Sequence, residues 1–258
     1  MRISALGAAA GALALTALIV PAAHATGADS GDIKILSATV NGGKDIVIGT
    51  TTKTITATVT ASDPSYIKNV SLVLFHGTHM NTDNFDGVLN PTTSQASCRK
   101  TNYATSTCTI TISGNPVLLE NRTAGTWKVY IWVIAKDGDQ TYADPYSSVR
   151  IQRKSRLTVN ASPEPVAKGK TITVAGKLSR ASWWDDLEYH GYAKQPVKLQ
   201  FRKAGTNTYT TVKTTYSNAY GNLKTTVKAS VDGYWRYNFA GTTTTPAVKA
   251  TGDYVDVR

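Results

Sequence analysis

The sequence lacks helical periodicity of useful length outside its first 25 residues, and it contains few residues of the kinds that carry nucleophilic chemistry. There are 4 His and 2 Cys among 258 residues, and there is no G-x-S-x-G motif. A catalytic triad needs a nucleophile, a base and an orienting group, and the histidines after residue 25 are His76, His79 and His190. The sequence therefore predicts an all-β, non-enzymatic protein, with an unrecognised hydrolase as an alternative.

The longest apolar run lies at the N-terminus. Residues 3–20 are mostly Ala, Leu and Gly and follow Arg2, and the small residues Ala23 and Ala25 form an A-x-A cleavage site. This pattern is typical of a secretory signal peptide, residues 1–25, that is cut after Ala25. The alternative is a transmembrane anchor, for which the run is of marginal length. We expect an extracellular, secreted protein with a flexible N-terminus at 26–32 and no membrane span after cleavage.

The two cysteines are consistent with export. Cys98 and Cys108 lie close together in the sequence, and in an oxidising compartment such a pair predicts one disulfide that closes a loop. A two-cysteine metal site is the alternative, but it lacks a second pair of ligands.

Alternating side chains indicate two strands that are each the last but one of a domain. Residues 232–239 (DGYWRYNF) place Trp235 on one face and Tyr234 and Arg236 on the other, after an Asp-Gly turn. Residues 127–133 (WKVYIWV) are apolar on both faces and are expected at the centre of a sheet. Several shorter alternating segments at even spacing favour β-sandwiches.

The strand pattern divides the chain into two domains, residues 33–154 and residues 155–258. No Pro- or Gly-rich spacer separates them, so we expect them to lie end to end with limited freedom. Two long loops are predicted, at 76–96 and 179–194. Long loops are candidate functional surfaces.

Several segments carry a resemblance to known proteins. They are residues 124–127 (AGTW), 135–139 (AKDGD), 161–166 (ASPEPV), 171–178 (TITVAGKL), 196–202 (PVKLQFR) and 232–235 (DGYW). With these segments the chain resembles a family of secreted actinobacterial proteins of unknown function that have two bacterial Ig-like β-sandwich domains. The resemblance implies two tandem Ig-like β-sandwich domains after a cleaved signal peptide, and it implies no activity.

Positive charge is in excess and unevenly distributed. Residues 26–154 hold 12 Lys and Arg and 10 Asp and Glu, whereas residues 155–258 hold 15 and 7, a net charge of +8. A secreted basic domain would attract anionic cell-wall polymers or other acidic polysaccharides through salt-screened fields, and nucleic acid only without specificity. The alternative is that these lysines only keep a β-protein soluble. The candidate basic surface comprises Lys198, Arg202, Lys224 and Lys228.

The loop at 179–194 is rich in aromatic residues, which can stack on sugar rings. Its candidate ligand-binding aromatics are Trp183, Trp184, Tyr189 and Tyr192. This loop makes a carbohydrate-binding module the second hypothesis for function. The alternative is that one or two of these side chains plug the end of a sandwich. The same loop holds the carboxylates of a hypothetical glycoside hydrolase, Asp185, Asp186 and Glu188.

No cofactor is predicted, but two groups of residues have metal-ligand chemistry. Asp137, Asp139 and Asp144 supply oxygen ligands of the kind that calcium prefers, although an Asp-Gly turn explains the first two without a metal. The second group, a candidate transition-metal site, comprises His76, His79, Asp83 and Asp86. Taken together, the sequence predicts a secreted binding or surface-interaction protein and does not identify its partner.

Overall fold

A computed structural model describes residues 31–80 and 84–258. The predicted signal peptide, residues 26–30 and Asp83 lie outside these ranges. Within them the chain is built from strands, and the helices are short 3-10 segments: η1 (Asn41–Gly43), η3 (Pro116–Leu118) and η4 (Asn121–Thr123). No helix in the described ranges is long and apolar enough to cross a membrane. The expected all-β fold is confirmed.

The first half of the chain forms two sheets that face each other. One sheet has the order β1-β3-β7-β6 and the other has the order β2-β9-β8-β4-β5. The strands of the first sheet are β1 (Lys34–Val40), β3 (Lys53–Ser62), β7 (Thr105–Gly114) and β6 (Ser97–Lys100). Those of the second are β2 (Ile46–Ile48), β9 (Gln140–Arg153), β8 (Gly125–Ala135), β4 (Ile67–Gly77) and β5 (Phe85–Leu89). We call this unit the first sandwich.

Its strand order is that of an immunoglobulin-like sandwich. In chain order the strands fall into the A-B-E-D sheet and the G-F-C-C′ sheet of that fold. All pairings are antiparallel except that of β2 with β9, which is parallel. The inter-sheet disulfide of antibody domains is absent, because Cys98 and Cys108 are bonded to each other across the neighbouring strands β6 and β7. The predicted disulfide is thus present.

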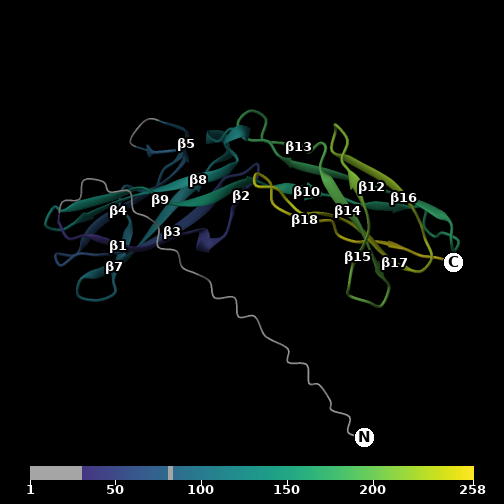
Figure 1. Ribbon diagram of the computed structural model, residues 1–258, viewed down its shortest axis with the longest axis horizontal. Coiled ribbons are helices and arrows are strands. Elements are labelled where there is room, and N and C mark those ends of the chain that lie inside the picture. Colours follow the sequence, from purple (N-terminus) through teal and green to yellow (C-terminus); the bar gives the residue numbers. More distant parts are fainter. Residues whose placement is uncertain (1–30, 81–83) are drawn as a thin grey trace, which may run out of the picture.

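The second half repeats this arrangement, and we call it the second sandwich. One sheet is centred on β12 (Thr171–Ala181), which pairs with β10 (Ser155–Leu157), β11 (Asn160–Ser162), β13 (Tyr189–Gly191) and β16 (Asn222–Lys228). The other is centred on β17 (Gly233–Phe239) and contains β14 (Pro196–Lys203), β15 (Thr210–Tyr216), β18 (Val248–Lys249) and β19 (Asp253–Val255). Figure 1 shows the two sandwiches end to end along the long axis.

The two strands singled out by alternation are central, as predicted. β8 pairs with β4 and β9, and β17 pairs with β14, β18 and β19. Trp127 and Tyr237 are fully buried, one in each of two separate core clusters. The Tyr237 hydroxyl donates a hydrogen bond of 2.9 Å to the Val174 carbonyl, and burial raises the pKa of Tyr237 to about 12.

Two expectations from the sequence are wrong in detail. The predicted loop at 76–96 contains β5, which pairs with β4. The predicted loop at 179–194 is shorter, because β12 runs on to Ala181 and β13 begins at Tyr189. β8 is central as expected, and its Trp132 is 39% exposed because the outer face of the sheet is open to solvent.

Candidate functional site: the junction loop and the arginine–tyrosine face

The loop that the sequence marked as an aromatic binding loop joins the two sandwiches. Trp183 is 0% exposed and belongs, with Ala181, to the hydrophobic core of the first sandwich. Its indole N–H lies 3.4 Å from the Ile48 carbonyl as donor, and its backbone N–H donates to Asn121 Oδ1 at 2.9 Å. A side chain from the second half of the chain therefore closes the core of the first.

The backbone on both sides of this tryptophan is also held. Ala181 N–H donates to the Lys154 carbonyl at 2.8 Å, and Arg153 Nε donates to the Ala181 carbonyl at 2.6 Å. Arg153 is buried, and desolvation followed by the charge of Arg180 lowers its pKa to about 10. On the far side, Gln152 Nε2 and Ser155 Oγ donate to the carbonyls of Thr242 and Pro246. The junction is thus a hydrogen-bonded contact rather than a free linker.

This arrangement corrects the candidate aromatic set. Trp183 presents no surface to a ligand. Tyr189 and Tyr192 are half-buried, and each has one guanidinium group over its ring, that of Arg156 or Arg180, with the carbon atom 3.5 or 3.9 Å from the ring centroid. Trp184, at 61% exposed, is the most open of the four to solvent. The candidate carbohydrate-binding loop therefore loses Trp183, whose side chain builds the junction.

The carboxylates of the same loop are engaged locally. Asp186 accepts the Glu188 backbone N–H at 3.1 Å and pairs with His190. The Glu188 N–H, and then His190, lower the pKa of the Asp186 carboxyl. Asp185, Asp186 and Glu188 lie on one turn, so they do not face one another across a cleft as a glycosidase pair does.

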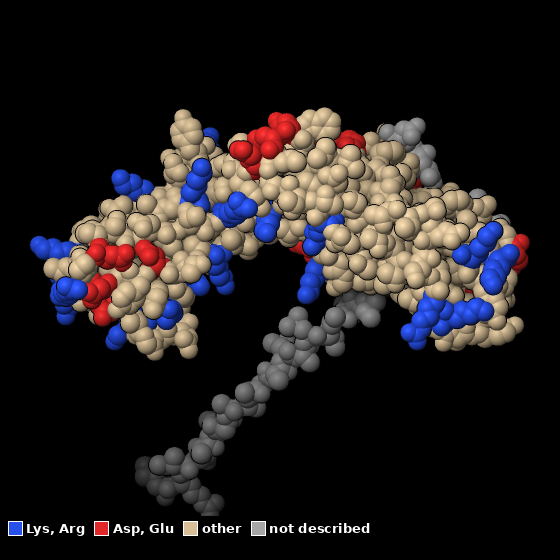
Figure 2. Space-filling model, turned by 180° about the vertical axis from the view of Figure 1, so that it is seen from behind, with Lys and Arg blue, Asp and Glu red and all other residues tan. Residues whose placement is uncertain are grey.

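The four residues of the candidate basic surface lie on two different sheets. Lys198 and Arg202 alternate with the buried Val197 and Leu199 along β14. Lys224 and Lys228 project from the outer face of β16, which belongs to the opposite sheet. They do not form one continuous cluster, because outward side chains of two packed sheets point in opposite directions. In Figure 2 the basic side chains of the second sandwich are spread over the surface, with acidic ones among them at its far end.

The outer face of the β14–β17 sheet instead combines arginine with tyrosine. The register places Arg202 beside Tyr234, Gln200 beside Arg236, and Tyr234 beside Tyr254. The guanidinium carbon of Arg202 lies 4.0 Å from the Tyr234 ring centroid, and that of Arg236 lies 3.6 Å from the Tyr209 centroid. We call these residues the arginine–tyrosine face: Arg202, Tyr209, Tyr234, Arg236 and Tyr254.

The two arginines of this face are held in place without a carboxylate. Arg236 Nε donates to Gln200 Oε1 at 2.9 Å, and Arg202 donates to the Thr206 carbonyl. Neither arginine forms an ion pair with any residue in the described ranges. The nearby acids Asp232 and Asp253 accept the backbone N–H groups of Val257 and Ala161. The face therefore presents two fixed guanidinium groups between aromatic rings, neither of them in an ion pair, with the Asp232 carboxylate beside Tyr254.

The metal candidates from the sequence are not assembled as expected. Asp137 Oδ1 accepts the Asp139 backbone N–H, and Asp144 Oδ1 accepts that of Met80. Asp139 instead lies in a cluster with Asp32 and Asp63, from segments distant in the sequence.

The histidine group is likewise dispersed. His76 pairs with Asp86, which also binds Arg122, whereas His79 Nδ1 lies 3.1 Å from the Asp144 carbonyl oxygen. Asp83 lies outside the described residues.

Comparisons with known proteins supply no activity. Residues 47–133, from β2 into β8, match the model of a family of unknown function (DUF5707). No curated protein matches the chain.

Similar solved structures include latent PorU from Porphyromonas gingivalis (13% identity, TM-score 0.30), with 87% of this chain and 20% of PorU covered. The D00-D0 domain of intimin matches at 12% identity and a TM-score of 0.28, with 85% of this chain and 99% of that chain covered. The adhesin InvE of Yersinia pseudotuberculosis matches at 13% identity and a TM-score of 0.27, with 87% and 60% covered. The fold assignment rests on this chain's own strand order.

The sequence alone predicts only part of the arginine–tyrosine face. Alternation puts Tyr234 and Arg236 on the outer side of their strand. Alternation does not indicate that Arg202 lies beside Tyr234, because the sequence of neither strand specifies that β14 pairs with β17. Tyr209 and Tyr254 come from two further segments, and only the assembled sheet brings them together.

Proposed function

We propose that this protein is an exported, non-enzymatic binding protein whose second sandwich binds anionic polymers of the cell envelope on the arginine–tyrosine face. The observation that carries the proposal is the pair of guanidinium groups, Arg202 and Arg236, each stacked on tyrosine and free of a carboxylate partner in the described chain. Guanidinium groups bind carboxylate and phosphate in a bidentate manner, and stacking reduces the rotamer entropy lost on binding.

Charge and compartment support the same proposal. Residues 155–258 carry a net charge of +8, which raises the local concentration of polyanions. The disulfide is consistent with an oxidising compartment outside the cytosol, where wall polymers and acidic polysaccharides are the abundant polyanions. The tyrosine rings add apolar faces that suit the sugar units of such a polymer.

The test compares two double variants with the same change of charge. Arg202→Gln with Arg236→Gln alters the arginine–tyrosine face, whereas Lys224→Gln with Lys228→Gln alters the opposite sheet. Binding to a purified anionic wall polysaccharide is measured by calorimetry at low and physiological salt, with a neutral polysaccharide as the control ligand. We expect the arginine variant to lose at least about tenfold in affinity and the lysine variant about twofold, because long-range attraction alone is screened.

Equal losses of affinity in the two variants would show that binding depends only on net charge and would contradict the proposal. Absence of binding at low salt, or equal binding of the neutral polysaccharide, would overturn the proposal. Nucleic acid of equal charge density serves as a further competitor. Preference for it over the wall polymer would contradict the assigned ligand class.

A further inference from the structure

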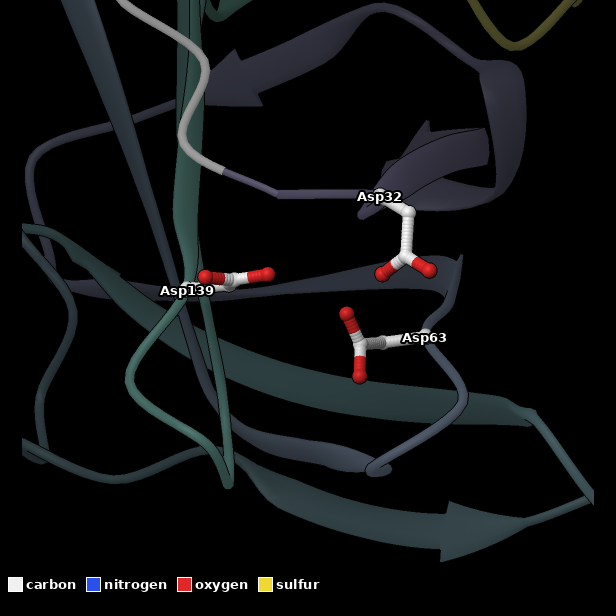
Figure 3. A group of neighbouring side chains, drawn as sticks. All are labelled: Asp32, Asp63 and Asp139. Atoms are coloured by element: carbon white, nitrogen blue, oxygen red, sulfur yellow. The ribbon is translucent and has the colours of Figure 1, made fainter.

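Three carboxylates meet at the end of the first sandwich that lies away from the junction. Asp32 precedes β1, Asp63 follows β3, and Asp139 closes the hairpin between β8 and β9. One oxygen from each lies within 4.8 Å of the others. Figure 3 shows the three side chains directed toward a common point, although they come from three separate segments.

The buried member of this cluster has an oxygen without a partner. Asp63 is 1% exposed, and its Oδ2 makes no hydrogen bond within the described chain. Its Oδ1 accepts two, from the backbone N–H of Ser65 at 2.7 Å and from the Ser65 hydroxyl at 2.6 Å. A buried carboxylate oxygen with no donor is costly, since burial removes its hydration without replacing it. The Asp63 side chain is thus fixed through Oδ1, and Oδ2 is left available to an external ligand.

The charge of the cluster is not compensated. No Lys, Arg or His of the described residues forms an ion pair with Asp32, Asp63 or Asp139. Desolvation, and then the adjacent Asp63 carboxyl group, raise the pKa of the Asp32 carboxyl. Two species relieve such repulsion: a proton shared by two carboxylates, or a cation bound by all three.

We propose that Asp32, Asp63 and Asp139 bind a calcium ion that fastens the start of β1 to the end of the first sandwich. The donor set is oxygen only, which suits a hard cation and excludes the soft-ligand metals. Calcium accepts irregular coordination completed by carbonyl groups and water, whereas magnesium demands a near-ideal octahedron. The three segments come from both sheets of the sandwich. β1 and β3 lie in one sheet, and the β8–β9 hairpin lies in the other.

The backbone at the start of β1 fits this role. Gly31 has φ +93°, and a methyl group on its Cα would lie 1.5 Å from Asp139 Oδ2. The chain before β1 therefore passes directly against the cluster, and a glycine is required at the point of contact. An ion bound here would connect the N-terminal segment to the folded unit.

The hairpin offers a matched control. Asp137 lies two residues from Asp139, and its Oδ1 accepts the Asp139 N–H at 3.1 Å, but it is not a member of the cluster. Asp137→Asn keeps that acceptor and removes the same charge as Asp63→Asn. Asp63→Asn in turn keeps the oxygen that holds Ser65, so the loop retains its hydrogen bonds.

The experiment measures calcium binding by calorimetry and thermal unfolding with calcium or with EGTA, using the purified full-length protein and both variants. We expect a Kd of about 10⁻⁴–10⁻³ M, the range of extracellular calcium modules, and a rise in Tm with calcium for wild type and for Asp137→Asn. Asp63→Asn is expected to lose at least about tenfold in affinity and to lose the rise. In EGTA it should melt at or above wild type, because one repelling charge is gone.

Each other outcome overturns the proposal. An unchanged Tm and no heat of binding in wild type would leave the shared proton as the explanation of the cluster. An equal loss of calcium affinity in Asp63→Asn and Asp137→Asn would mean that calcium binding depends on net charge and not on these ligands. An equal response to magnesium would overturn the assignment to calcium. None of these results depends on the arginine–tyrosine face, which lies in the other sandwich.

Discussion

Trp183 shows how one side chain can belong to a different unit from its neighbours in sequence. Its backbone continues from β12 of the second sandwich, yet its ring is fully buried among residues of the first. Trp184, the next residue, has φ +83° and is 61% exposed. A bulky residue at positive φ is uncommon, and here this backbone conformation turns the chain so that one tryptophan points inward and the next outward.

We predict that Trp183→Ala destabilises the protein by about 3–5 kcal/mol, the usual cost of removing a buried aromatic ring. Trp184→Ala should change the free energy of unfolding by about 0.5 kcal/mol or less, because the ring is largely in solvent. Urea unfolding followed by circular dichroism measures both. Similar midpoints for the two variants would show that the Trp183 ring does not support the first core.

At the scale of strands, the edge strand β6 depends on its disulfide. All four of its residues, Ser97–Lys100, are exposed, so β6 is held by its pairing with β7 and by the bond between Cys98 and Cys108. An edge strand with no buried side chain gains little from the hydrophobic effect. The covalent bond is therefore the main restraint on this segment.

Replacing both cysteines by serine should cost about 2–4 kcal/mol of stability, as expected for a short disulfide loop. The loss should appear as a lower urea midpoint, and as fast hydrogen exchange confined to 97–108. Reduced wild-type protein serves as the control, because it lacks the bond but keeps the buried Cys108 side chain, and it should unfold at or slightly above the midpoint of the double variant. A double variant as stable as the oxidised protein would contradict this account.

The sequence predicts the strands with a clear apolar pattern and misses those without one. β17 was recognised because inward apolar and outward polar side chains alternate along it, and β8 because it is apolar on both faces. β5 was missed because Asp86 and Gly87 interrupt its pattern, and it is held by pairing with β4 instead. Local pattern reports how a segment could be buried, but it does not report which segment lies beside it.

The same limit applies to the sites. Asp139 was recognised as a calcium candidate from its own hairpin, with Asp137 and Asp144 as partners. In the structure its neighbours are instead Asp32, which lies just before β1, and Asp63, which lies just after β3. Short-range spacing identifies a ligand set only when the ligands share one loop, and a set contributed by three loops requires the fold to be known first.

At the scale of the whole molecule, the junction determines how the two sandwiches depend on each other. Each has its own core cluster, but the first cluster includes Ala181 and Trp183 from the second half of the chain. We propose that the boundary lies near Lys154 and Ser155 and that residues 155–258 fold alone, since their own cluster contains no residue from the first half. Separation would expose Trp183 and leave the first core without its cover.

This dependence is tested by placing one substitution in two contexts. Trp183→Ser in residues 155–258 alone should change the free energy of unfolding by about 0.5 kcal/mol or less and reduce self-association, because the ring would be a surface residue there. In the full-length protein the same substitution should cost about 3–5 kcal/mol, because it empties a filled site in the first core. Urea unfolding of all four proteins gives the difference directly. If the substitution were equally costly in both contexts, Trp183 would belong to the second core, and if residues 155–258 gave no dispersed NMR signals, the proposed boundary would be wrong.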